Sequence, residues 1–106
     1  MDKKAALTVI AKFQKALEAK GIIVNKLILY GSFAIGQFKE GSDIDIVVIA
    51  NDFADKTYWE RINILSDAIY EVFAPLEVVG ITPDEWERGD SFIVDYARNG
   101  EVVYAA

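Results

Sequence analysis

Apolar residues recur every three or four positions near the start of the chain, which is the spacing of one face of an α-helix. Within Lys3–Lys20 this face carries Ile10, Phe13 and Leu17, whereas lysine and glutamate occupy many of the other positions. Gly21 stands where a helix commonly ends with a glycine. The pattern therefore predicts an amphipathic helix over Lys3–Lys20.

A second helical pattern covers Ala54–Phe73. Asn51, Asp52 and Asp55 are candidates for its N-terminal cap, and Pro75 stops it because proline lacks the N–H that a helix needs. Its apolar face consists of Ile62, Leu65, Ile69, Val72 and Phe73, and we interpret Tyr58 and Trp59 as core rather than interface residues.

Three short apolar segments have the composition of β-strands. They are Lys26–Tyr30, Asp43–Ala50 and Leu76–Ile81, and each is rich in isoleucine, leucine or valine. A glycine-containing loop separates the first strand from the second, and the second helical pattern separates the second strand from the third. The pattern therefore predicts three strands interspersed with helices.

The end of the chain permits two interpretations. Thr82-Pro83 opens a helical turn that reaches Glu87, with proline at the first helical position. After it, Asn99-Gly100 between two apolar runs is typical of a β-hairpin. Alternatively, Ser91 caps a helix that ends before Asn99, and a short extended segment over Glu101–Tyr104 follows. Periodicity does not decide between them.

Length and composition limit the chemistry that this chain can perform. With 106 residues, we expect one domain over residues 1–106, and the absence of cysteine and histidine removes thiolate chemistry and the usual general base. Any metal chemistry must use carboxylates, which favours Mg²⁺ or Mn²⁺ over zinc. The formal net charge of −6 argues against direct nucleic-acid binding through a broad basic face.

The apolar content, 53%, is high for a chain of this length. A small domain buries a smaller fraction of its surface than a large one, so part of this apolar area is expected outside the core, where a protein interface would cover it. The N-terminus lacks the uninterrupted apolar run of a signal peptide, and no segment has the length of a membrane span. We therefore expect a cytoplasmic protein that is not in the membrane.

Two aspartates interrupt the second predicted strand in a manner that suggests a metal site. Asp43 and Asp45 are one residue apart, and side chains alternate along a strand, so both carboxylates point to one face while Ile44 and Ile46 point to the other. Two like charges so close repel each other unless a cation lies between them. Hard divalent cations such as Mg²⁺ prefer carboxylate oxygens.

Gly31 and Ser32 follow directly after the first predicted strand. A glycine at this place lets the backbone approach a ligand closely, and the next N–H groups together with the Ser32 hydroxyl can bind phosphate oxygens. A short helix is expected just after Ser32. A phosphate-binding loop that faces a pair of metal-binding carboxylates is the outline of a nucleotide site.

The sequence Gly31-Ser32, ten residues, then Asp43-Ile44-Asp45 resembles the signature of the DNA polymerase β-like nucleotidyltransferase superfamily. It is most similar to the minimal nucleotidyltransferases (MNT), the antitoxin type that pairs with HEPN proteins. LYGS, GSDIDIVV and LEVVGITPDEWE are also similar to segments of that family. The resemblance spans roughly Lys26–Glu87. It implies an α/β (α+β) nucleotidyltransferase fold, a small mixed β-sheet with helices packed on it, and it favours the helix after Ser91.

The same resemblance gives Glu77 a role as a third carboxylate. A single charged residue on a strand is also common where it protects a sheet edge, which is the alternative interpretation of Glu77. The family usually has aspartate at this position, so the side chain here is longer by one methylene. The expected catalytic and metal-binding residues are thus Asp43, Asp45 and Glu77. The expected metal is two Mg²⁺ ions or Mn²⁺, and the expected nucleotide-binding residues are Gly31 and Ser32.

The implied reaction is the transfer of AMP from ATP, or of another nucleoside monophosphate from its triphosphate, to an acceptor hydroxyl. The implied acceptor is a tyrosine of a small helical HEPN toxin, which would make the chain an antitoxin. The alternative is a non-catalytic antitoxin or regulatory subunit that neutralises its partner by binding alone. The sequence leaves the acceptor, the nucleotide base and the oligomeric state open, a homo-oligomer included.

Overall fold

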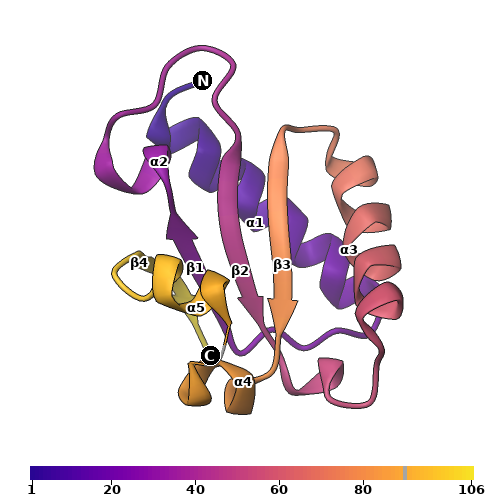
Figure 1. Cartoon of the computed structure of the whole chain (residues 1–106). Helices are drawn as coiled ribbons and strands as arrows, with labels where there is room; N and C mark the ends of the chain where they lie inside the picture. Colours follow the sequence, from indigo (N-terminus) through magenta and orange to yellow (C-terminus); the bar gives the residue numbers. More distant parts are fainter. Residues whose placement is uncertain (90) are drawn as a thin grey trace.

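Four strands form one mixed sheet, with helices on both of its faces (Figure 1). The computed structural model describes residues 1–89 and 91–106. In chain order, the elements are α1 (Lys3–Ala19), β1 (Lys26–Tyr30), α2 (Ser32–Ile35), β2 (Ile44–Ile49), a 3-10 turn (Asn51–Phe53), α3 (Tyr58–Val72), β3 (Leu76–Ile81), α4 (Pro83–Arg88), α5 (Phe92–Ala97) and β4 (Glu101–Ala105).

The strand order is β3-β2-β1-β4, with β1 antiparallel to β2 and to β4, and β2 parallel to β3. Parallel neighbours need a long crossover, which α3 provides between β2 and β3. The arrangement confirms the expected α/β class with a small mixed sheet. It also confirms the helical interpretation of the tail, since α5 precedes Asn99-Gly100 and β4 pairs with β1 instead of forming a hairpin with its own neighbour.

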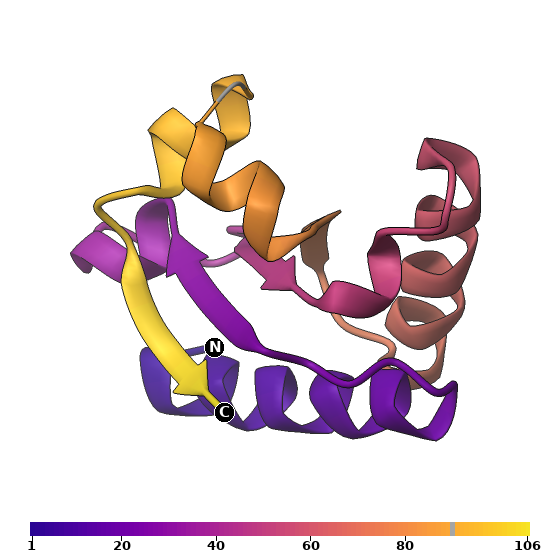
Figure 2. The same cartoon turned by 90° about the horizontal axis from the view of Figure 1, so that it is seen from below.

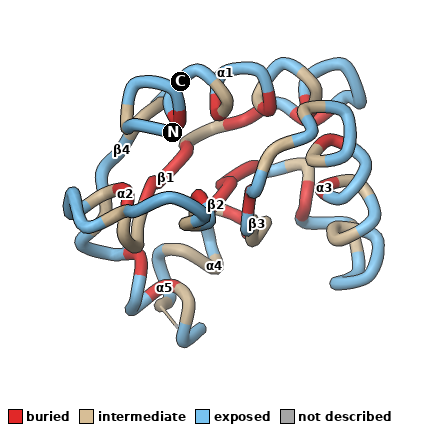
Figure 3. Tube along the Cα trace, turned by 90° about the horizontal axis from the view of Figure 1, so that it is seen from above, coloured by how far each residue is buried: buried red, intermediate tan, exposed pale blue. Residues whose placement is uncertain are grey.

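The core consists of two layers separated by the sheet. Helix α1 crosses one face, α4 and α5 lie on the opposite face, and α3 lies beside β3 (Figure 2). Buried positions concentrate on the central strands and on the inner side of α1 (Figure 3). The larger layer includes the predicted residues Ile10, Phe13, Leu17 and Leu65, and the smaller one includes Ile28, Val47, Ile49, Ile81, Val94 and Ala97.

The second long helix starts later than expected. Ala54–Phe73 was the predicted range, but α3 begins at Tyr58 because Thr57 and Glu60 form a reciprocal capping box. The Thr57 side chain accepts a hydrogen bond from the Glu60 N–H, and the Glu60 carboxylate accepts one from the Thr57 N–H. Neither Asn51, Asp52 nor Asp55 caps α3.

The expectation that Tyr58 and Trp59 belong to the core is wrong. They are 69% and 70% exposed, and their rings contact each other edge-on on the first turn of α3. Phe53 instead packs in the core against β3. Its ring lies so close to Gly80 that a Cβ atom on this glycine would be 2.9 Å from the ring. The Arg61 guanidinium covers the same ring at 5.8 Å from its centroid.

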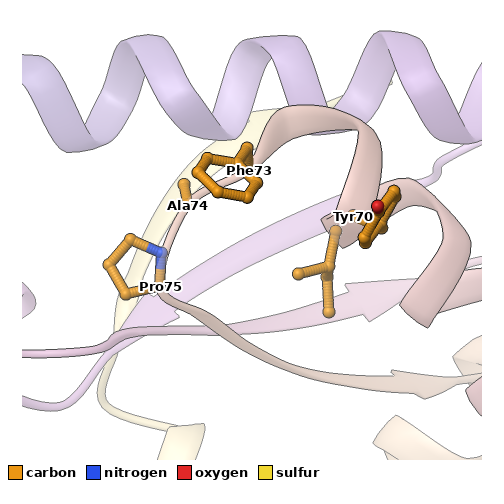
Figure 4. Close-up of a pocket in the computed structure, with 5 residues that line it drawn as sticks. Tyr70, Phe73, Ala74 and Pro75 are labelled. Atoms are coloured by element: carbon orange, nitrogen blue, oxygen red, sulfur yellow. The ribbon is translucent and has the colours of Figure 1, made fainter.

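Phe73 differs from its predicted place in the apolar face of α3. It is the C-cap in the left-handed region, with φ 56°, and its side chain is 89% exposed. It lies over a shallow apolar hollow of about 350 Å³ together with Ile69, Tyr70, Ala74 and Pro75 (Figure 4). The expected apolar surface outside the core is therefore present, most clearly at the end of α3. Among the described residues, no helix has the length and apolar character needed to cross a membrane.

The backbone at residue 73 suits glycine better than phenylalanine, since a left-handed conformation costs a side chain bearing a Cβ about 1 kcal/mol. We predict that Phe73→Gly is more stable than Phe73→Ala, which removes the same ring but keeps the Cβ. The expected difference is about 4 °C or more in Tm for a domain of this size. Thermal unfolding of the two variants checks it, and equal midpoints would contradict it.

Candidate active site

The predicted site residues meet at one end of the sheet, where β1 ends and where β2 and β3 begin (Figure 1). Tyr30 on β1 is paired with Asp45 on β2, and Asp45 is paired with Glu77 on β3. Directly opposed residues of neighbouring strands place their side chains on the same face of a sheet. The strand register thus brings together residues that are 15 and 32 positions apart in sequence.

The alternation predicted for Asp43 and Asp45 agrees with the burial of their neighbours. Ile44 and Ile46 are completely buried in the layer beneath α1, whereas Asp45 is half-buried toward the other face. Asp43 is exposed and immediately precedes β2, which begins at Ile44 and not at Asp43. The two carboxylates therefore belong to one site, with Asp45 deeper than Asp43.

The electrostatic environment of Asp45 is unfavourable to its charged form. Burial, followed by a hydrogen bond with Glu77 and the negative charges of Glu77 and Asp43, raises the pKa of Asp45 to about 6. Like charges held at neighbouring positions produce this effect unless a cation neutralises them. The charged form of Asp45 therefore costs the folded protein stability at neutral pH.

Tyr30 is a member of the site that the sequence interpretation did not include. Burial, followed by the charges of Asp45 and Glu77, raises the pKa of the Tyr30 phenol to about 12, so it stays a neutral hydrogen-bond donor. Its ring meets that of Tyr96 edge-on, with centroids 6.2 Å apart. The position of Tyr30 beside Asp45 depends on the register between β1 and β2, and no local pattern in the sequence indicates this register.

Gly31 is required for two separate reasons. Its φ of 72° and ψ of −155° form a conformation that L side chains rarely adopt, and a Cβ atom there would lie 2.3 Å from Oδ2 of Asp45. Ser32 begins α2, and its carbonyl oxygen accepts a hydrogen bond from the N–H of Gln37. Gly31 thus lies directly against the carboxylate of Asp45.

The donor set fits a hard divalent cation in its chemistry. Asp43, Asp45 and Glu77 offer only oxygen atoms, and a cation would remove the repulsion that raises the pKa of Asp45. Within residues 1–89 and 91–106, no three acidic side chains already stand close enough together to enclose a metal ion. Asp45 and Glu77 are in contact, while Asp43 approaches them from the loop that precedes β2.

A family model described as a nucleotidyltransferase domain matches residues 10–97 of this chain. The match contains the whole Gly31-to-Asp45 segment and Glu77. No protein with a curated description matches the sequence significantly.

Several solved structures have a similar fold. A candidate nucleotidyltransferase from Sulfolobus solfataricus aligns with a TM-score of 0.72 and 15% identity, over 94% of this chain and 80% of that one. A chain of a toxin–antitoxin complex with AMP-PNP aligns with a TM-score of 0.61 and 20% identity, over 94% and 73%. A chain of the complex between tri-AMPylated Shewanella oneidensis HEPN toxin and an MNT antitoxin aligns with a TM-score of 0.57 and 18% identity, over 98% and 73%. At these identities, the likeness establishes the fold.

The raised pKa of Asp45 predicts that Asp45→Asn stabilises the metal-free protein at neutral pH. The folded pKa of about 6 lies above the unfolded value, so the wild type loses stability as the pH rises from about 4 to 6, and the amide does not. Thermal unfolding in EDTA should show that the Tm of Asp45→Asn exceeds that of wild type. This difference in Tm should increase as the pH rises from about 4 to 6 and stay constant at higher pH. The exposed Asp67→Asn is the control. A difference that does not depend on pH would contradict the prediction.

Proposed function

The chain belongs to the nucleotidyltransferase domain family, and on this premise we propose that it transfers AMP from ATP to an acceptor hydroxyl as a minimal nucleotidyltransferase. The observation that supports this most strongly is the contact of Gly31 with Asp45, which in turn contacts Glu77. A loop able to bind phosphates and a set of carboxylates able to bind a cation occur side by side. Both are needed to bring a nucleoside triphosphate to reaction.

In this proposal, the loop and the carboxylates have different tasks. The backbone of Gly31 and the hydroxyl of Ser32 bind the terminal phosphates, which approach closely because Gly31 has no side chain. Asp43, Asp45 and Glu77 would hold the divalent metal, two Mg²⁺ ions or Mn²⁺. A bound divalent ion supplies charge neutralisation at the phosphates and at the attacking oxygen.

The transfer forms one bond and breaks one. The acceptor oxygen attacks the α-phosphorus of ATP, the bond between the α-phosphorus and the bridging oxygen breaks, and pyrophosphate leaves with that electron pair. The proton of the hydroxyl passes to Glu77, the carboxylate that lies on the strand beside Asp45. The protein contributes mainly by positioning and by stabilising charge.

We further propose that the acceptor is a tyrosine of a HEPN-type partner, and that the chain acts as its antitoxin. Two observations support this: the fold is that of chains in toxin–antitoxin complexes, and large aromatic side chains on α3 are exposed. A partner bound near the end of α3 would lie close to the site, since Pro75 is two residues from Glu77 in sequence. The cytoplasm, where ATP is abundant, is the compartment that fits this reaction.

The second candidate function is neutralisation by binding alone. The exposure of Asp43 and the glutamate at position 77, where the family usually has aspartate, favour it. Retained neutralisation by an Asp43→Ala, Asp45→Ala variant that still forms the complex would support this candidate over transfer.

The proposed reaction predicts which phosphate of ATP reaches the partner. After incubation of the chain, Mg²⁺ and a HEPN-type partner, label from α-³²P-ATP should appear on the partner, whereas label from γ-³²P-ATP should leave as pyrophosphate. Asp45→Asn should reduce incorporation by about 100-fold or more, because a charge needed in the transition state is removed.

Glu77 provides the matched pair of variants for this assay. Glu77→Asp restores the usual residue of the family and should keep the transfer, and Glu77→Gln should lose most of it. Transfer of the γ-label, or equal activity of Glu77→Gln and wild type, would contradict the assigned roles.

A further inference from the structure

Beside the Gly31-Ser32 loop lies a hollow of about 320 Å³ whose opposite wall comes from the far end of the chain. Gly31 and Ser32 line one side, and Tyr96, Asn99 and Gly100 line the other. Pockets for small molecules begin at about 300 Å³, so the space suits a nucleoside-sized group. The hollow therefore shares Gly31 and Ser32 with the proposed phosphate-binding loop.

The aromatic side chain of Tyr96 lines this hollow. Tyr96 is 65% exposed, although its helix buries Val94 and Ala97. Tyr30 contacts it edge-on at 6.2 Å with an interplanar angle of 69°, and Phe92 contacts it at 6.2 Å and 36°. Both contacts leave the ring partly open to solvent, and together they restrict its orientation. A restricted, exposed aromatic face is a surface on which a nucleobase can stack.

Two amide side chains lie at the same hollow. Gln37 is on the side of α2, and Asn99 is on the turn that follows α5. Within the described part of the chain, neither side-chain amide takes part in a hydrogen bond, and both residues are exposed. Asparagine and glutamine amides offer both a donor and an acceptor, which match the edge of a purine.

The wall that carries Asn99 is held firmly against the strand that leads to Gly31. A Cβ atom on Gly100 would lie 2.5 Å from the carbonyl oxygen of Leu29, so only glycine allows this close approach. The next residue, Glu101, is paired with Leu29 in the sheet. One wall follows β1 directly at Gly31, and the other is joined to β1 through the pairing of Glu101. The fold therefore fixes the distance between the Gly31-Ser32 loop and Tyr96.

We propose that this hollow is the nucleoside subsite, in which a purine base stacks on Tyr96 and Asn99 and Gln37 bind its polar edge. The inference rests on the proposed function, which places the triphosphate on Gly31 and Ser32. A purine is favoured over a pyrimidine because its larger π-face gains more from stacking. Tyr96 is thus a residue that determines which nucleotide binds, and it takes no part in the transfer itself.

The test is calorimetric titration with two probes, Mg²⁺-ATP and Mg²⁺-tripolyphosphate, which share the phosphates but differ in the nucleoside. Tyr96→Ala should weaken ATP binding by about 5- to 100-fold, the loss expected when one base loses its aromatic stacking partner. Tripolyphosphate binding should stay within about 2-fold, since it does not reach the aromatic wall. The preference for ATP over CTP should also diminish in this variant.

Two further variants separate stacking from general damage. Tyr96→Phe keeps the ring and should bind ATP within about 2-fold of wild type. Tyr70→Ala removes an exposed tyrosine distant from the hollow and should also bind as wild type does. Circular dichroism verifies that each variant is folded.

The possible results distinguish the subsite from the function on which it rests. Equal ATP affinity of Tyr96→Ala and wild type, with both probes bound, would overturn the subsite and leave the proposed transferase intact. Failure of wild type to bind either probe would overturn both. Parallel weakening of ATP and tripolyphosphate would also overturn the subsite, because the loss would then lie in phosphate binding.

Discussion

The contact between the half-buried Asp45 and Glu77 is the constraint on which the rest of this site depends. It is unfavourable in isolation, since burial and neighbouring negative charge raise the pKa of Asp45 to about 6. The fold nevertheless enforces it through the register of β2 and β3, with completely buried Ile44 and Ile46 anchoring the same strand. A domain of 106 residues has little stability in reserve, so such a contact indicates a task other than folding.

The positions around this contact follow from it. Residue 31 must be glycine because a Cβ atom would strike the Asp45 carboxylate, and the same glycine leaves the backbone open to phosphate oxygens. β4 extends the sheet beyond β1, and its approach through Gly100 places Tyr96 and Asn99 opposite that loop. The fold thus brings the proposed metal-binding, phosphate-binding and nucleoside-binding elements to one end of a small sheet.

Much of this was predictable from local patterns. The period of two along a strand predicted the shared face of Asp43 and Asp45, and the helical period predicted most of the core of α1. The position of Glu77 came from the family resemblance, since a parallel pairing across 32 residues has no local signal. Tyr30 was missed because its position beside Asp45 depends on an antiparallel pairing across 15 residues.

The errors in α3 came from assigning a whole apolar face to the core without regard to where the helix starts and stops. The capping box moved the start to Tyr58, and Phe73 adopted a left-handed conformation outside the helix.

The central claim is that these carboxylates and the Gly31-Ser32 loop form a site for a metal-bound nucleoside triphosphate. Calorimetric titration of ATP into wild type and into an Asp43→Asn, Asp45→Asn variant, each with Mg²⁺ and with EDTA, tests it most directly. The account predicts binding only for wild type with Mg²⁺. Binding that persists in EDTA, or equal binding by the variant, would contradict it.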